Sequence, residues 1–218
     1  LYWMARDQRA ADNWALLRAA ALAKENGSKA RVVFALAPIT TERRLDFQLK
    51  GLVETGRDLN AKGFAFDLLE VADDAGAAVA AFAAAQKVSH VVCDFSPLRE
   101  AKRGTKALVD ALPDTIGASL VDAHNIVPVW AASPKQEVGA RTLRKKISDQ
   151  LPRYLKELPP LAAQGPALQA TVDWRPVIKA ARQKTDRTVA PVAWLTPGSK
   201  ASLDALEAFC GAGRLKRF

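Results

Sequence analysis

The first fifteen residues, Leu1-Tyr-Trp-Met-Ala-Arg-Asp-Gln-Arg-Ala-Ala-Asp-Asn-Trp-Ala15, set the pattern that the next hundred residues repeat. An apolar run is followed by a charged turn and then by the first turns of an amphipathic helix. In the helix that we expect over residues 9–26, Trp14, Leu17 and Leu22 share one face and charged side chains take the other. The stretch therefore predicts a strand, a turn and a helix in succession.

The alternation of strand and helix continues to about residue 122. Helix-like segments are expected at 9–26, 42–62, 73–87 and 99–111. The apolar, strand-like runs are Leu1–Met4, Arg31–Ala37, Ala65–Glu70, His90–Asp94 and Ser119–Asp122. This order is typical of a parallel sheet covered on both faces. We therefore predict an α/β fold, with a Rossmann-like, open, mostly parallel five-stranded sheet and helices on both faces.

The rhythm changes after residue 123. Residues 124–134 have no helical period and are expected to form an ordered connection, whereas Glu137–Leu151 has helical spacing. Prolines at 152, 159, 160 and 166 indicate a linker. Short helices are expected at 174–183 and 199–210, the second with Ser199 as its N-cap. We divide the chain into an α/β domain (1–133), a basic, mainly helical or irregular interdomain linker (134–198) and the start of a helical domain (199–218).

The net charge of +9 is unevenly distributed along the 218 residues. Residues 1–134 carry 16 Lys and Arg against 16 Asp and Glu, whereas residues 135–218 carry 16 against 7. A basic segment favours nucleic acid or an acidic partner domain, because neutralising phosphates supplies most sequence-independent DNA affinity. A solvated basic surface would have the same composition, so charge alone leaves these alternatives open.

Several classes of site and location are disfavoured. Cys93 and Cys210 have no CxxC spacing, so we expect neither a disulfide framework nor a metal site, and Cys93 is expected to be a buried hydrophobe. No glycine-rich phosphate loop occurs, which disfavours dinucleotide or nucleoside triphosphate sites of those kinds. No apolar run approaches the roughly 18–20 residues of a membrane span, so no membrane partner and no secretion are expected.

Three polar clusters follow the first, fourth and fifth predicted strands. They are Arg6–Arg9, Asp94–Pro97 and Asp122–Asn125. Ligands of open parallel sheets bind at the carboxyl ends of the strands, so the clusters could line one pocket. The alternative is that Asp7 and Asp12 cap the first helix and Ser96 begins the fourth.

Four segments of the chain carry a resemblance to a known family. The opening fifteen residues, Asp94-Phe-Ser-Pro-Leu-Arg99, Val121-Asp-Ala-His-Asn-Ile-Val-Pro128 and Lys135-Gln-Glu-Val-Gly-Ala-Arg-Thr-Leu-Arg144 resemble class II cyclobutane pyrimidine dimer (deoxyribodipyrimidine) photolyases. Weaker similarity extends to residues 194–198. The resemblance implies a DNA-repair lyase that splits flipped-out pyrimidine dimers by light-driven electron transfer from reduced FAD.

The resemblance also implies that the chain is a fragment. Photolyases carry a large helical domain that holds the flavin and the lesion, and it would follow Phe218. The first strand would likewise be truncated at Leu1. We therefore expect no catalytic residue in this chain, and expect the fragment alone to bind no flavin and to repair nothing. The expected partners are UV-damaged DNA, mainly through that further domain, and the flavin domain itself. We expect a monomer in the bacterial cytoplasm, or in the nucleus of a eukaryote.

Two sets of residues acquire roles from the resemblance. An antenna chromophore, a deazaflavin or a folate, would lie in a cleft at the strand ends. Its candidate lining is Met4, Arg6, Pro38, Asp94, Phe95 and Ser96. The second set is Arg141, Arg144 and Lys145, which would brace the flavin domain or approach DNA phosphates. The alternative is a solvated helix face on which Glu137 pairs with Arg141.

Two other functions remain open at this stage. One is a stand-alone chromophore- or nucleotide-binding module. The other is a light-sensing protein of the cryptochrome type that acts through a partner and not through repair. The class II segments at 94–99 and 135–144 argue against the second, because cryptochromes mostly resemble the other photolyase branches.

Overall fold

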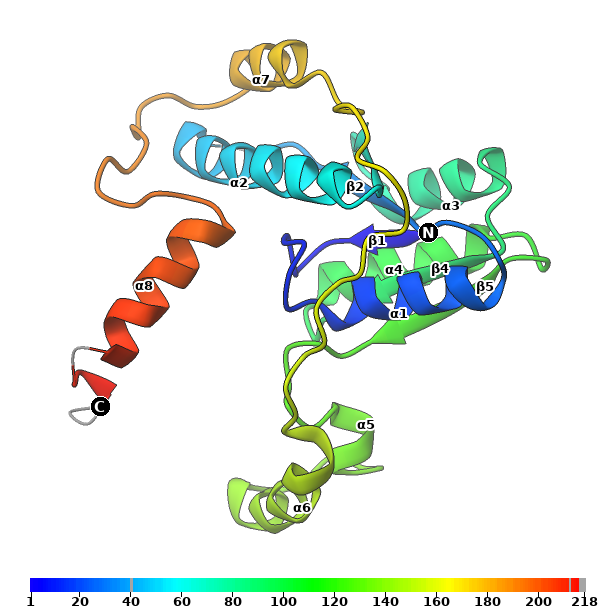
Figure 1. Ribbon diagram of the computed structural model, residues 1–218, viewed down its shortest axis with the longest axis vertical. Coiled ribbons are helices and arrows are strands. Elements are labelled where there is room, and N and C mark those ends of the chain that lie inside the picture. Colours follow the sequence, from blue (N-terminus) through cyan, green and yellow to red (C-terminus); the bar gives the residue numbers. More distant parts are fainter. Residues whose placement is uncertain (40, 212, 216–218) are drawn as a thin grey trace.

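The computed structural model describes residues 1–39, 41–211 and 213–215 (Figure 1). Within these residues, five strands form one parallel sheet in the order β3-β2-β1-β4-β5. The strands are β1 (Tyr2–Met4), β2 (Arg31–Leu36), β3 (Ala65–Glu70), β4 (His90–Asp94) and β5 (Gly117–Val121). The predicted α/β fold with a parallel five-stranded sheet is confirmed, although β5 begins two residues earlier than expected.

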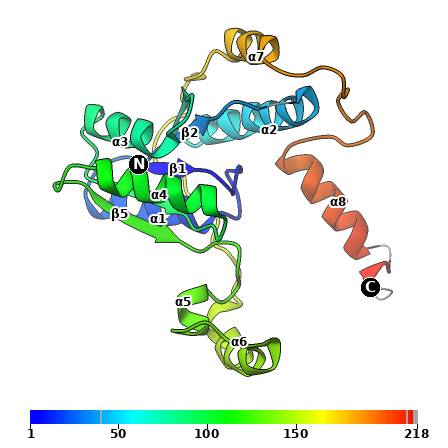
Figure 2. The same ribbon diagram turned by 180° about the vertical axis from the view of Figure 1, so that it is seen from behind.

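Helices cover both faces of the sheet. Figures 1 and 2 show α1 (Trp14–Glu25) and α2 (Glu42–Ala61) on one side, with α3 (Ala75–Ala85) and α4 (Arg99–Ala111) on the other. Successive side chains of a strand point to opposite faces. Tyr2 and Met4 therefore join the core beneath α1 and α2, whereas Trp3 joins the core beneath α3 and α4 together with Cys93, which is buried as predicted.

The first helix begins at Trp14 and not at residue 9 as predicted. Asn13 is its N-cap, and its side chain accepts a hydrogen bond from the amide of Leu16 at 2.9 Å. Neither Asp7 nor Asp12 caps the helix. Asp12 has a φ of 47°, which takes the chain out of helical geometry just before the cap.

The connection after β5 contains a helical turn that the sequence analysis did not predict. This turn, α5 (Val129–Ala132), begins after Pro128, and the amide of Val129 donates to the carboxylate of Asp122 at 3.0 Å. A helix of four residues is too short to show a helical period, and the two prolines in this stretch also argue against a helix. The next helix, α6 (Ala140–Tyr154), begins later than the predicted residue 137 and has no buried residue.

The segment predicted as an interdomain linker returns across the α/β domain. In Figure 1 the chain leaves α6, passes α1 and α2, and reaches α7 (Trp174–Gln183) above α2. Leu161 is buried in the core, and the Gln164 side chain donates to the carbonyl of Ala30 at 2.6 Å and accepts from its amide at 2.8 Å. Trp174 stacks on Phe66 with ring centroids 6.0 Å apart. Residues 155–174 therefore form a strap that is fixed to the starts of β2 and β3.

The last helix, α8 (Ser199–Gly211), lies beside α2 and away from the sheet (Figure 1). Its predicted range of 199–210 is confirmed within one residue, but Ser199 is the first helical residue and not the N-cap. The predicted domain start at 199–218 includes residues 212 and 216–218, which lie outside the described residues. Among the helices that the structure describes, none is long and apolar enough to cross a membrane.

The crossing of α3 and α4 depends on Gly76. A Cβ atom there would lie 2.1 Å from the carbonyl oxygen of Gly104 and 2.6 Å from the amide nitrogen of Leu108. Both atoms belong to the backbone, so neither can rotate away. We expect Gly76→Ala to lower the free energy of unfolding by about 2–3 kcal/mol, because the helices must separate, as measured by urea denaturation.

The matched control is Gly51→Ala in α2, where a Cβ atom would meet nothing nearer than 4.0 Å. That variant should be neutral or more stable by up to about 1 kcal/mol, because alanine has the higher helix propensity. Equal effects of the two substitutions would show that the α3–α4 approach does not limit stability.

Candidate functional site

The sheet has its topological switch point between β1 and β4. From β1 the chain builds β2 and β3 on one side, and then crosses to build β4 and β5 on the other. The loops that leave β1 and β4 therefore diverge, and the carboxyl end of this strand pair is where open α/β sheets bind ligands. The polar clusters at 6–9, 94–97 and 122–125 all follow strands that end at this rim.

Asp94, the last residue of β4, joins the two central strands at the rim. Its Oδ2 accepts hydrogen bonds from the amides of Ala5 and Arg6 at 2.9 and 2.8 Å, and the Tyr2 hydroxyl donates to its Oδ1 at 2.9 Å. Burial raises the pKa of the Asp94 carboxyl above its usual value, and the three hydrogen bonds oppose that shift. Burial and the Asp94 charge together raise the pKa of Tyr2 well above 10.

Asn13 extends this buried network to the start of α1. Its side-chain amide donates to the Tyr2 hydroxyl at 3.1 Å and to the carbonyl of Asp7 at 2.9 Å. Asp7 is 1% exposed, and its Oδ1 lies 2.8 Å from Arg9 and 3.1 Å from Nε2 of His124. Its Oδ2 has no hydrogen-bond partner among the described residues. The charged turn that the sequence singled out is therefore mostly a structural element that fastens the β1–α1 loop.

The structure brings together three of the six residues predicted to line the antenna cleft. Arg6, Asp94 and Ser96 border one cavity of about 230 Å³ between the sheet and α4, with Trp3 and Ala101 among its other walls. Such a volume is smaller than the roughly 300–1,000 Å³ of typical ligand sites. The Asp94 oxygens that face the β1 loop are already occupied.

The other three predicted residues lie elsewhere. Met4 is fully buried in the core beneath α1 and α2. Phe95 packs edge to face against Trp130, with ring centroids 5.6 Å apart, and so connects the rim to α5. Pro38 is exposed in the loop between β2 and α2.

Two larger cavities adjoin the same rim on the side of α2. They have volumes of about 520 and 420 Å³ and share the walls formed by Gln8, Phe47 and Gln48. Phe47 is 42% exposed, and Gln48 Nε2 donates to Gln8 Oε1 at 3.3 Å. Arg43 and Arg44 also line the first of these cavities, so its border is cationic.

The sequence analysis missed Phe47 and Gln48 because both lie on the helical face of α2 with no motif around them. Gln8 lies in the polar cluster Arg6–Arg9, and its position after the first strand could have indicated it as a site residue. Tyr2 and Asn13 were missed as network members, because an aromatic residue in an apolar strand and an asparagine before a helix have common structural explanations.

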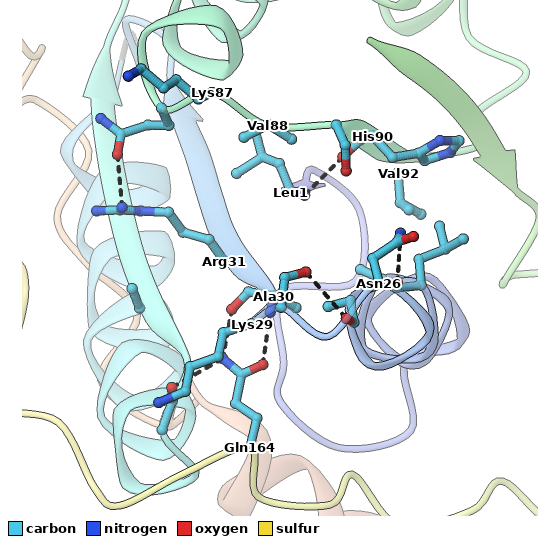
Figure 3. Close-up of a pocket in the computed structure, with 18 of the residues that line it drawn as sticks. Leu1, Asn26, Lys29, Ala30, Arg31, Lys87, Val88, His90, Val92 and Gln164 are labelled. Carbon is cyan, nitrogen blue, oxygen red and sulfur yellow. Dashed lines mark hydrogen bonds between the residues drawn. The ribbon is translucent and has the colours of Figure 1, made fainter.

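A further cavity of about 390 Å³ lies at the opposite, amino ends of the strands (Figure 3). Lys29, Arg31 and Lys87 border it, which suggests an anion site. However, the carboxyl ends of α1 and α3 also border it, and the partial negative charge of helix carboxyl ends attracts cations. Arg31 already pairs with Asp67. The helix carboxyl ends and Asp67 thus account for these cationic side chains without a bound anion.

The predicted cationic residues of α6 are exposed, and Figure 1 shows that this helix lies apart from the sheet. Within the described part of the chain, Arg141 and Arg144 make no ion pair, whereas Lys145 pairs with Asp149 at 2.7 Å. The pair of Glu137 with Arg141, which belonged to the alternative of a solvated helix face, is not formed. Glu137 instead pairs with Lys146, which, with the Ser133 hydroxyl, lowers the pKa of Glu137 to about 2. Residue 137 precedes the helix, so an i,i+4 spacing does not apply to it.

Removal of the Asp94 carboxylate should destabilise the domain strongly. We expect Asp94→Ala to cost at least about 3 kcal/mol, because two amides and the Tyr2 hydroxyl would lose their acceptor, as measured by urea denaturation. Asp94→Asn should cost less, because its amide oxygen still accepts. The control Asp114→Ala, at an exposed residue, should change stability by less than about 0.5 kcal/mol. Equal losses at both aspartates would contradict this role for Asp94.

The raised pKa of Asp94 also predicts that the stability lost in Asp94→Asn depends on pH. Since the pKa of Asp94 is raised by folding, its contribution to stability is fully present below the unfolded pKa and is lost as pH rises through the folded pKa. The stability difference between the native protein and Asp94→Asn should therefore be larger at pH 4 than at pH 7. A difference that is constant with pH would contradict the shift.

The chain is similar over its whole length to known proteins. The family profile described as DNA photolyase matches residues 1–167. The deoxyribodipyrimidine photo-lyase of Potorous tridactylus is 41% identical over 225 residues, covering 100% of this chain and 41% of that protein. The photo-lyases of Arabidopsis thaliana and Oryza sativa subsp. japonica are each 39% identical and are matched over 42% of their lengths. The chain thus spans about two fifths of these relatives.

A solved structure has the same fold at lower sequence similarity. The crystal structure of a cryptochrome from Synechocystis sp. PCC6803 superposes with a TM-score of 0.69 at 16% identity, over 99% of this chain and 47% of that one. Identity at this level supports the fold alone. The family match covers most of the chain, and the full-length alignment to the photo-lyases agrees with it: the chain belongs to the DNA photolyase family.

Proposed function

We propose that this chain forms the α/β part of a deoxyribodipyrimidine photolyase, which repairs UV-damaged DNA by light-driven electron transfer from reduced FAD to a pyrimidine dimer. The observation that carries the proposal is 41% identity across the entire chain to a protein of that name. The relatives extend well beyond the matched region, so we infer that the rest of the full-length protein supplies the flavin and lesion sites.

The residues of this chain do not fit FAD. Dinucleotide sites in such sheets need a glycine-rich turn after the first strand, so that the pyrophosphate can approach the backbone. Here that turn carries the side chains of Arg6, Asp7 and Gln8, and the Asp7 carboxylate is buried in it. A carboxylate at that position would repel a pyrophosphate. We therefore derive no step of the repair reaction from this chain.

The proposed role of the chain is to hold the flavin-binding part in place. Two helices, α6 and α8, flank the carboxyl rim of the sheet in Figure 1 and have no buried residue. Leu203 and Leu206 of α8 are 45% and 55% exposed. On α6, Arg141 and Arg144 would contact acidic or carbonyl groups of the following domain. DNA would be contacted mainly by that domain.

A second part of the proposal concerns an antenna chromophore, which absorbs light and passes excitation to the flavin. A deazaflavin or a folate needs a cavity that excludes water and holds a planar ring system. The cavities that share Gln8, Phe47 and Gln48 have the volume for one, whereas the cavity at Arg6, Asp94 and Ser96 is small. We therefore favour Phe47 as the ring contact. Arg43 and Arg44 would suit a carboxylate tail such as that of a folate.

Repair activity tests the main proposal. The full-length protein should contain stoichiometric flavin and should repair dimers in irradiated DNA only under light, whereas the 218-residue chain should contain no flavin and show no repair. Flavin or repair in the short chain would place the active site within it. A full-length protein that binds flavin but never repairs would favour the cryptochrome-type alternative.

Substitution in the two candidate cavities tests the antenna. In the full-length protein, Phe47→Ala should reduce the chromophore retained on purification by about tenfold, because a ring contact of roughly 1–1.5 kcal/mol is lost. Ala101→Leu, which fills the small rim cavity, should retain it. Trp194→Ala, at a residue 84% exposed, is the control. The opposite result for Phe47 and Ala101 would assign the antenna to the rim cavity.

A further inference from the structure

Helix α8 begins without a side-chain cap of its own. Gly198 precedes the first helical residue and has no side chain that could accept a hydrogen bond from the free amides of the first turn. The amide of Lys200, at the second helical position, donates instead to Oε1 of Glu54 at 2.9 Å. Glu54 belongs to α2, 146 residues away. A carboxylate from another helix therefore takes the place of the N-cap.

The backbone at Gly198 is shaped to admit this carboxylate. Its φ is +110°, a conformation that favours glycine. A Cβ atom at Gly198 would lie 2.3 Å from Oε2 of Glu54. The amino end of a helix carries partial positive charge, so a carboxylate there is also favoured electrostatically. The Lys200 ammonium group pairs with Asp204 at 3.2 Å, so the contact of Glu54 is with the backbone.

Helix α8 is joined to α2 by the hydrogen bond from the Lys200 amide to Glu54. It has no buried residue, and Figure 1 shows it extending away from the sheet. Yet α8 forms one wall of the cavity of about 420 Å³, through Ser202, Leu203 and Leu206, and α2 forms the facing wall through Phe47 and Gly51. The cavity exists only while α8 keeps its angle to α2.

We propose that Glu54 is a positioning residue that caps α8 in trans, fixes the angle at which α8 leaves α2, and so forms the cavity between them. The contact joins α2 of the α/β domain to α8. The cap is formed by residues of this chain, and it is present whether or not the cavity holds an antenna.

Hydrogen exchange on the 218-residue chain tests the cap. In Glu54→Ala the amides of α8 should exchange about fivefold faster, the effect of losing one capping interaction. Exchange in α3 and α4 should not change. Glu54→Gln should retain most of the protection, because an amide oxygen can still accept from Lys200. Glu100→Ala, at an exposed residue that pairs with Arg103 on α4, is the matched control.

A distance measurement tests the position of α8. Cys210 is exposed near the end of α8, whereas Cys93 is buried and burial raises its thiol pKa to about 12, so Cys210 can be labelled selectively. With a second label at Lys102→Cys on α4, the label-to-label distance distribution should be broader in Glu54→Ala than in the native protein. Gly198→Ala should broaden it as well, because its Cβ displaces the carboxylate.

If Glu54→Ala melts like the native protein but leaves both the exchange of α8 and the distance distribution unchanged, the cap does not position the helix and the proposal is wrong. If Glu54→Ala instead melts much lower, the Gly198→Ala variant carries the test, because it alters the same contact from the side of α8. Native behaviour in Gly198→Ala would then also reject the proposal.

Discussion

One buried carboxylate holds the centre of this sheet together. Asp94 at the end of β4 accepts hydrogen bonds from the amides of Ala5 and Arg6, just beyond β1, and from the hydroxyl of Tyr2 in β1. The backbone ladder pairs Tyr2 with Val92 and Trp3 with Cys93, and the Asp94 bonds extend the connection between β1 and β4 past the end of β1 at the switch point. The β1–α1 loop, the N-cap at Asn13 and the position of α1 follow from that geometry. The same contacts occupy the Asp94 oxygens, which is why a residue in the expected ligand position is mainly structural.

Long-range contacts then place the parts that extend beyond the sheet. Gln164 fixes the strap by pairing with both backbone groups of Ala30, Phe95 and Trp130 connect the rim to α5, and Glu54 caps α8. Each of these contacts joins residues far apart in the chain. Together they fasten the segments that carry α5, α7 and α8 to the sheet domain.

Family membership and the geometry of the carboxyl rim bear on different features of this chain. Family membership agrees with the α/β fold, and the described residues include no group of three or more His, Cys, Asp or Glu that could hold a metal ion. The cavities beside Phe47 are better candidates for a ligand site than the smaller cavity bordered by Arg6 and Ser96, because volume limits which ligand a cavity can hold. Lys145 in the basic second half pairs with Asp149, whereas Arg141 and Arg144 make no ion pair with any residue that the structure describes.

The sequence by itself determined the sheet, its parallel strands, most of the helices and the family, because apolar period and turn residues are local properties that survive without knowledge of contacts. It also indicated which strand ends carry polar groups. Only the tertiary structure decided that Asn13 and not Asp7 caps α1, that Glu137 pairs with Lys146, that residues 155–174 pack back onto the domain, and that Glu54 caps α8. These features depend on which groups meet after the chain has folded. The Glu54 carboxylate accepts a hydrogen bond from an amide 146 residues away, and such a contact leaves no periodic pattern in the sequence.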